Sequence, residues 1–224
     1  MVLIGYNVYK LVFWKIDVTK NETIKKELNG SINKNIVNFK YLKKKNKDTI
    51  AYIKVNNTNI DYIVVKTDDN SYYLNHNFNN EKNIAGWIFA DYRNKLDETD
   101  KNIIIYGHNM RDGSMFETLK YVLNKDWYTN EENHIVTFVT EKGLYKYQVF
   151  SSYSIKAEDY YITTNFNNDD EYYKFINKLK DRSIYDYKVE LSSTDQILTL
   201  SSCIGDGKER VVLHAKLLEK TIKE

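Results

Sequence analysis

Near its C-terminus the chain reads Thr199-Leu200-Ser201-Ser202-Cys203, then the short loop Ile204–Glu209, then Arg210-Val211-Val212-Leu213-His214-Ala215-Lys216-Leu217. Both runs are rich in apolar and β-branched residues, which is typical of buried strands. A short loop between paired strands brings its two ends together. The stretch therefore predicts two neighbouring strands that place Cys203 close to Arg210.

These residue types suit covalent catalysis. Cys203 is the chain's only cysteine, and His108 follows the strongly β-forming run Ile103–Gly107. A thiol is nucleophilic as thiolate, which a nearby imidazolium favours, and an arginine is a permanent donor to an oxyanion. The competing interpretation is that Cys203 is a small buried hydrophobic residue, the commoner fate of a single cysteine.

The rest of the chain predicts many short strands and few helices. Helices are expected over 5–45, broken at Asn29-Gly30-Ser31, over 114–123, and over 169–180 with a cap in Asn167–Asp169. Strands are expected at 50–55, 60–65, 86–90, 102–107, 134–140, 144–154, 195–202 and 210–218, with a hairpin turn at 141–143. Such a pattern favours a mixed or closed β-barrel.

Composition excludes several classes of function. With a net charge of +2 and a pI near 8.3, the chain is too evenly charged to indicate binding to nucleic acid. The chain has no CxxC, HExxH, Walker or GxGxxG motif, so we expect neither a metal site nor a nucleotide cofactor. One cysteine also rules out an internal disulfide.

The N-terminus carries a weaker signal. No run of 18 apolar residues is present, but aromatic residues and lysines follow Val2–Gly5, as they do beside membrane helices. Residues 6–16 would equally suit an amphipathic helix that packs on the domain.

Three ordered motifs resemble the class B sortases. TLSSC with its arginine resembles the TLxTC active-site strand of the sortases, and Tyr106–Phe116 resembles the class B histidine segment. The third motif comprises Tyr73–Phe78, Ala85–Phe89 and Asp91-Tyr92-Arg93-Asn94. The resemblance runs in register from about Asn46 to the C-terminus.

This resemblance implies a mainly β fold with added helices. It implies an eight-stranded barrel, N-terminal helices, and a helix between the sixth and seventh strands, where 169–180 lies. We accordingly predict an N-terminal helical segment over 1–45, after a removed membrane anchor, and a catalytic barrel over 46–224. The family resemblance places such an enzyme on the outer face of a Gram-positive cell membrane.

The resemblance also implies roles for individual residues. Cys203 would be the nucleophile, His108 would protonate the leaving amine, and Arg210 would hold the substrate and the oxyanion. By position in the motifs, the substrate-binding residues would be Asn70, Leu74, Tyr106, Tyr161, Ile162 and Ser201. Plain core packing is the alternative for Leu74 and Ile162.

Other residues near the motifs admit two interpretations. Asp206 would complete a Cys-His-Asp triad or serve as a turn residue before Gly207. We expect His76, His134 and His214 to be structural. The chain departs from the family pattern at two positions: Ser202 stands where the family usually has threonine, and Ile204 follows the cysteine where a polar residue can occur.

The predicted function is a cysteine transpeptidase that needs no cofactor. It would cleave an NPxT-type sorting signal of surface proteins through a thioester and pass the product to an amine of a cell-wall precursor. Two alternatives stay open: a hydrolytic cysteine endopeptidase with the same residues, and a catalytically silent surface-binding barrel.

Overall fold

The computed structural model describes residues 2–156, 158–204 and 209–223, and its centre is a closed β-barrel. Around the barrel the strands follow the order β10-β8-β7-β3-β4-β5-β6-β9. The β4–β5 and β6–β9 pairs are parallel and the other pairs are antiparallel. The barrel strands are β3 (Thr49–Val55), β4 (Asp61–Val65), β5 (Phe89–Ala90), β6 (Asn102–Gly107), β7 (Ile135–Thr140), β8 (Gly143–Lys156), β9 (Ile197–Ile204) and β10 (Glu209–Ile222).

The barrel confirms the predicted fold class, including the inserted helix. Helix α4 (Asp169–Asp181) lies between β8 and β9, the sixth and seventh barrel strands. The Asn168 side chain caps it by accepting from the backbone N–H of Glu171 at 2.9 Å, as the sequence predicts. One face of α4 is buried through Tyr172, Ile176 and Leu179, whose spacing of four and three residues is helical.

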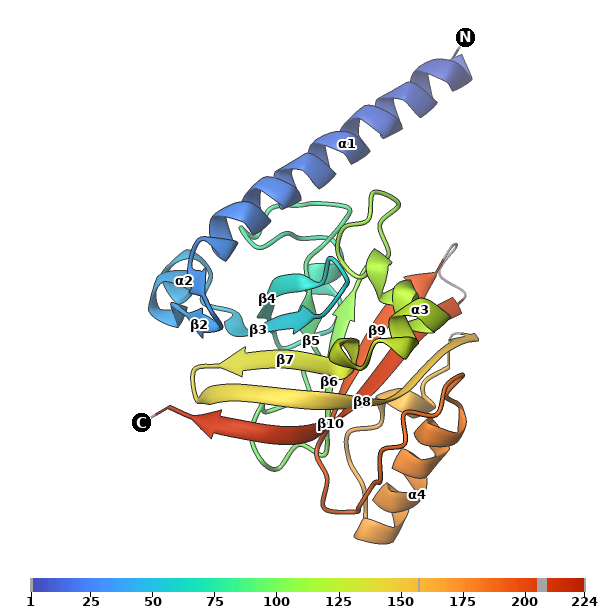
Figure 1. Cartoon of the computed structure of the whole chain (residues 1–224). Helices are drawn as coiled ribbons and strands as arrows, with labels where there is room; N and C mark the ends of the chain where they lie inside the picture. Colours follow the sequence, from blue (N-terminus) through green and yellow to red (C-terminus); the bar gives the residue numbers. More distant parts are fainter. Residues whose placement is uncertain (1, 157, 205–208, 224) are drawn as a thin grey trace.

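Helix α1 (Val2–Asn29) docks on the barrel mainly through its C-terminal half, and Trp14 also packs against the core. The Asn21 side chain donates to the Gly86 carbonyl at 2.9 Å, and Ile24 and Leu28 are buried. Towards its N-terminus the helix extends away from the barrel (Figure 1), and its apolar side chains there, Tyr9, Leu11, Val12, Phe13 and Ile16, are exposed. Within residues 6–16, this exposed set does not pack on the domain, whereas Trp14 does.

The second predicted N-terminal helix starts later than expected. A hairpin of β1 (Ile32–Asn33) and β2 (Ile36–Val37) follows α1, and α2 spans only Phe39–Lys45. Lys34 and Asn35 turn the hairpin with φ of 46° and 69°, a left-handed pair that asparagine tolerates well. The N-cap of α2 is Asn38, whose side chain accepts from the Tyr41 N–H.

Two further elements differ from the sequence-based expectation. The strand predicted over 86–90 is reduced to β5, because Gly86 has a φ of +57° and a Cβ there would lie 2.3 Å from the Tyr73 carbonyl oxygen. The helix predicted over 114–123 is the 3-10 helix η2 (Glu117–Leu123), followed by the short helix α3 (Lys125–Thr129). The remaining short 3-10 helices are η1 (Tyr72–Leu74), η3 (Glu131–His134) and η4 (Tyr160–Ile162).

The apolar core fills the barrel and continues under α1 and α2. Leu28 and Leu42 belong to the same cluster of buried residues as the barrel side chains Ile53 and Leu200. No helix in the described part of the chain is both long enough and apolar enough to span a bilayer. The division into a segment over 1–45 and a domain over 46–224 stays a prediction.

Candidate active site

Strand β9 lies between β6 and β10, and this order brings the three predicted catalytic residues to one end of the barrel. Arg210 pairs with Cys203 in the β9–β10 register, and Gly107 pairs with Ser202 in the β6–β9 register. His108 and Cys203 are each one residue beyond that last pair. The backbone of Cys203 is thus flanked by His108 on one side and Arg210 on the other, while its side chain lies outside the described residues.

Tight packing fixes the backbone just before His108. A Cβ on Gly107 would lie 2.5 Å from Ile88 Cδ1 and 2.6 Å from Phe116 Cγ, so only glycine fits there without a shift of its neighbours. The Phe116 N–H then donates to the His108 carbonyl at 2.8 Å. The segment after the histidine is therefore folded back against the end of β6.

A cavity of about 300 Å³ opens at this end of the barrel. His108 and Arg210 both line it, together with the whole predicted substrate-binding set: Asn70, Leu74, Tyr106, Tyr161, Ile162 and Ser201. Those eight residues come from five separate parts of the chain. Because the resemblance to the sortases implies a peptide substrate, we call this cavity the peptide groove below.

His108 is oriented by the segment that carries Leu74. Its Nε2 lies 2.7 Å from the Leu74 carbonyl oxygen. Because a carbonyl oxygen can only accept, Nε2 carries a proton in this arrangement. The Leu74 side chain is 42% exposed, so core packing is wrong as its explanation.

Tyr161 and Ser201 meet at the floor of the peptide groove. Their hydroxyl oxygens are 2.9 Å apart, and both residues are buried. The Asn102 side chain donates to the carbonyls of Tyr161 and Thr163 at 3.2 and 3.0 Å, which ties the η4 segment to β6. Ile162, next to Tyr161, is half-buried and lines the groove, so it packs on the core and faces the cavity at once.

The other three histidines are placed outside the peptide groove. His214 is completely buried between Thr199 of β9 and Tyr153 of β8, and burial lowers its pKa to about 3. His134 is bonded to the Tyr128 carbonyl at 2.8 Å, and His76 stacks on Tyr72 at 4.1 Å between ring centroids. None of them lines the cavity.

Sequence reasoning missed several groups at or behind the groove. Phe89, Glu158 and Asp159 also line it, although no role was assigned to them. Asp91 and Arg93 lie behind it and bond to groove residues. The only sequence signal for these two was their place in the quoted Asp91–Asn94 motif, since the groove residues that they contact, Asn70, Tyr106 and Ile162, lie 15 to 69 positions away.

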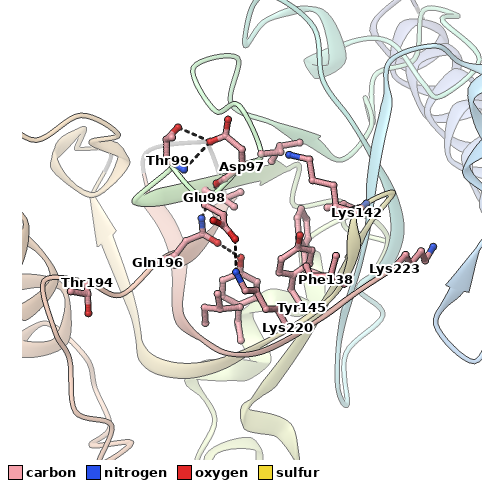
Figure 2. A pocket seen from close by; sticks show the side chains of 16 residues that line it. Asp97, Glu98, Thr99, Phe138, Lys142, Tyr145, Thr194, Gln196, Lys220 and Lys223 are labelled. Carbon is pink, nitrogen blue, oxygen red and sulfur yellow. Dashed lines mark hydrogen bonds and ion pairs between the residues drawn. The ribbon is translucent and has the colours of Figure 1, made fainter.

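A larger cavity, of about 720 Å³, lies at the opposite end of the barrel (Figure 2). It is lined by residues such as Phe138, Tyr145 and Gln196, and the ion pair between Lys220 and Glu98 lies at its edge. No histidine or cysteine is among its lining residues, so size does not identify the site. Within the described ranges no three His, Cys, Asp or Glu residues form a possible metal-binding group.

Asp206 lies outside the described residues, so the choice between a triad aspartate and a turn residue stays open. Arg210 is half-buried, and its Nη1 donates to the Glu209 carbonyl at 3.1 Å.

Known proteins resemble this chain over most of its length. The sequence signature of the family described as Sortase domain matches residues 53–218. Sortase B from Listeria monocytogenes is 42% identical over 184 residues, which are 80% of this chain and 73% of that protein.

Solved structures of sortase B enzymes resemble this chain as well. Sortase B from B. anthracis has a TM-score of 0.83 at 33% identity and covers 91% of this chain and 99% of its own. The Staphylococcus aureus sortase B–substrate complex has a TM-score of 0.76 at 32% identity, over 96% of this chain and 99% of that one.

Proposed function

Because this chain belongs to the class B sortases, a family of cysteine transpeptidases, we propose that it cleaves the sorting signal of surface proteins and joins the cleaved protein to an amine of a cell-wall precursor. The peptide it reads is of the NPxT type, cut after the threonine. The observation that carries this proposal is the peptide groove, which gathers His108, Arg210 and the six predicted substrate-binding residues in one cavity.

The reaction would proceed in two halves. The Cys203 thiolate attacks the threonine carbonyl carbon, and the Arg210 guanidinium stabilises the resulting oxyanion. When the C–N bond breaks, the departing amine takes a proton from His108 and a thioester is left on Cys203. The acceptor amine then attacks the thioester, gives its proton back to His108, and releases the thiolate with a new amide formed.

The hydrogen bond of His108 determines which of its two ring nitrogens gives a proton to the leaving amine. With Nε2 donating to the Leu74 carbonyl, Nδ1 is the ring nitrogen that exchanges a proton with the substrate. The same contact ties the histidine to the Leu74 segment, which also lines the groove. A peptide seated against Leu74 would therefore lie beside the acid that completes its cleavage.

Support for a peptide partner comes from the Staphylococcus aureus sortase B–substrate complex, which this chain resembles over 96% of its length. We further propose that the N-terminal half of α1 lies against the membrane on the outer face of the cell. Its exposed apolar residues, from Tyr9 to Ile16, support that placement, because they gain from contact with lipid.

The test is a product analysis with a panel of NPxT-type peptides, with and without a free amine. We expect cleavage after threonine, and a ligated amide when the amine is present. Cys203→Ala and His108→Ala should give neither product, whereas His134→Ala, a matched change away from the groove, should keep most activity.

Other outcomes would redirect the assignment. Cleavage that never yields the amide, even at saturating amine, would favour the hydrolytic endopeptidase. The absence of any cleavage, with no effect of blocking Cys203 on binding to cell-wall material, would indicate a noncatalytic barrel.

A further inference from the structure

Asp91 is a buried carboxylate just behind the peptide groove. It directly follows β5, its side chain is wholly inaccessible to solvent, and it is not among the residues that line the cavity. Its Oδ2 accepts from Asn70 Nδ2 at 3.0 Å and from the Tyr106 hydroxyl at 2.8 Å. One carboxylate thus holds two side chains of the groove that come from different parts of the chain.

Arg93 extends this connection to a third part of the groove. Its Nε donates to Asp91 Oδ1 at 2.8 Å and its Nη2 to Oδ2 at 2.7 Å, a two-point contact. The same Nη2 donates to the Ile162 carbonyl at 2.9 Å. The pair, which we call the Asp91–Arg93 clamp, therefore joins the Asn70 segment, the end of β6 and the η4 segment.

The balance of charges keeps Asp91 ionised. Burial pushes the pKa of this carboxyl upward, but the hydrogen bonds from the side chain and backbone of Arg93 and from Tyr106 outweigh it, and the net pKa lies below its usual value. A charged carboxylate accepts at both oxygens, so all of its donors are satisfied at once. The guanidinium offers a planar fork that a lysine lacks.

We propose that the Asp91–Arg93 clamp is a positioning device that sets the shape of the peptide groove for the sorting peptide. Neither residue touches the substrate; they act through the Asn70 amide, the Tyr106 hydroxyl and the Ile162 backbone. The inference rests on the proposed function, because it concerns how that same groove receives its peptide. It adds two residues to those that determine peptide affinity.

The test compares steady-state kinetics of peptide cleavage in the parent, in Asp91→Asn and in Arg93→Lys. The carboxamide keeps the shape of Asp91 but loses the charge and one acceptor, and the lysine keeps the charge but cannot reach both Asp91 oxygens and the Ile162 carbonyl. Losing charge-assisted hydrogen bonds changes an equilibrium constant roughly tenfold to a hundredfold. We expect KM to rise by about tenfold or more in both variants while kcat changes less than about threefold.

Two controls separate positioning from general damage. The rate of Cys203 alkylation by iodoacetamide should match the parent, because the clamp does not bond to His108 or Arg210 in the described structure. Asp195→Asn is a matched change: Asp195 is a partly buried carboxylate paired with Lys216 at 3.2 Å, beside the start of β9 at the other end of the barrel. It should leave KM unchanged.

The outcomes are distinct. If the parent cleaves no NPxT-type peptide, the proposed function fails and this inference fails with it. If the parent is active and a folded Asp91→Asn or Arg93→Lys keeps the parent KM, the clamp is not a positioning device although the function stands. If neither variant folds, the pair holds the fold rather than the groove, and the proposal is likewise overturned.

Discussion

His214 offers a sharp test of the packing between the barrel wall and the η4 segment, because it is a fully buried histidine with both ring nitrogens bonded. Nδ1 lies 2.9 Å from Thr199 Oγ1, and Nε2 lies 2.9 Å from the Tyr153 hydroxyl. The Thr199 hydroxyl donates to Asn102 Oδ1 at 2.7 Å, so it must accept from Nδ1–H. Tyr160 donates to the Tyr153 hydroxyl at 2.9 Å, which leaves Tyr153 to donate to Nε2.

This network stabilises the neutral imidazole and disfavours its protonation. Burial lowers the pKa of His214 from 6.5 to about 3. His214 therefore binds a proton below about pH 6.5 in the unfolded chain but only below about pH 3 in the folded chain. The free energy of unfolding consequently falls as the pH is lowered from 6.5 towards 3. At pH 5 the loss from His214 alone is about 2 kcal/mol relative to pH 7.5, since one pKa unit corresponds to about 1.4 kcal/mol.

The assay is urea unfolding of the parent and of His214→Gln at pH 7.5, 6.5 and 5. The glutamine amide keeps a donor and an acceptor but does not titrate. The variant should be less stable than the parent at pH 7.5. The difference between their free energies of unfolding should be smaller by about 2 kcal/mol at pH 5. If the free energies of unfolding of the two proteins differ by the same amount at all three pH values, with equal dependence on urea concentration, His214 is not a neutral buried histidine.

Three more perturbations have direct consequences. Gly107→Ala should destabilise the fold by roughly 1–3 kcal/mol and lower peptide cleavage, because the added Cβ would lie 2.6 Å from the Phe116 ring. A melting curve that matches that of the parent would contradict the packing described. Ser201→Ala should cost about 1 kcal/mol of stability and raise KM, because it removes one hydrogen bond of the Tyr161 hydroxyl in the groove floor. Unchanged unfolding and unchanged KM together would show that this bond is unimportant. Arg210→Lys should reduce kcat far more than it changes peptide binding, because the planar fork is lost; parent-like turnover would show that Arg210 is a structural charge.

The sequence predicted the barrel well because its strands have local signals. Apolar runs such as Ile103–Gly107 and Ile197–Leu200 are buried on the strands where they were expected. The N-terminal hairpin was missed because Lys34-Asn35 is a weak turn signal within a polar, lysine-rich segment that otherwise favours helix. The strand over 86–90 was overestimated because Gly86 has a left-handed φ of +57° and the Trp87 N–H donates to the distant Tyr73 carbonyl instead of to a neighbouring strand.

For the site, the structure gathers the residues predicted from the motifs around one cavity, but motif spacing could not supply the contacts between them. The bond from His108 to the Leu74 carbonyl joins residues 34 positions apart, and Arg93 reaches the Ile162 carbonyl across 69 positions. Such contacts follow from barrel closure rather than from local pattern. No local pattern identifies Asp91, because the groove residues that it contacts, Asn70 and Tyr106, lie 21 and 15 positions away.

The central claim is that Cys203 forms a covalent acyl intermediate in this groove. Its most direct test is the intact mass of the protein after rapid mixing with an NPxT-type peptide and no amine. We predict an adduct equal to the peptide's N-terminal part through threonine, localised to Cys203, released by hydroxylamine and absent from Cys203→Ala. An adduct that survives in Cys203→Ala, or product that forms with no adduct on Cys203 at any time, would contradict the account.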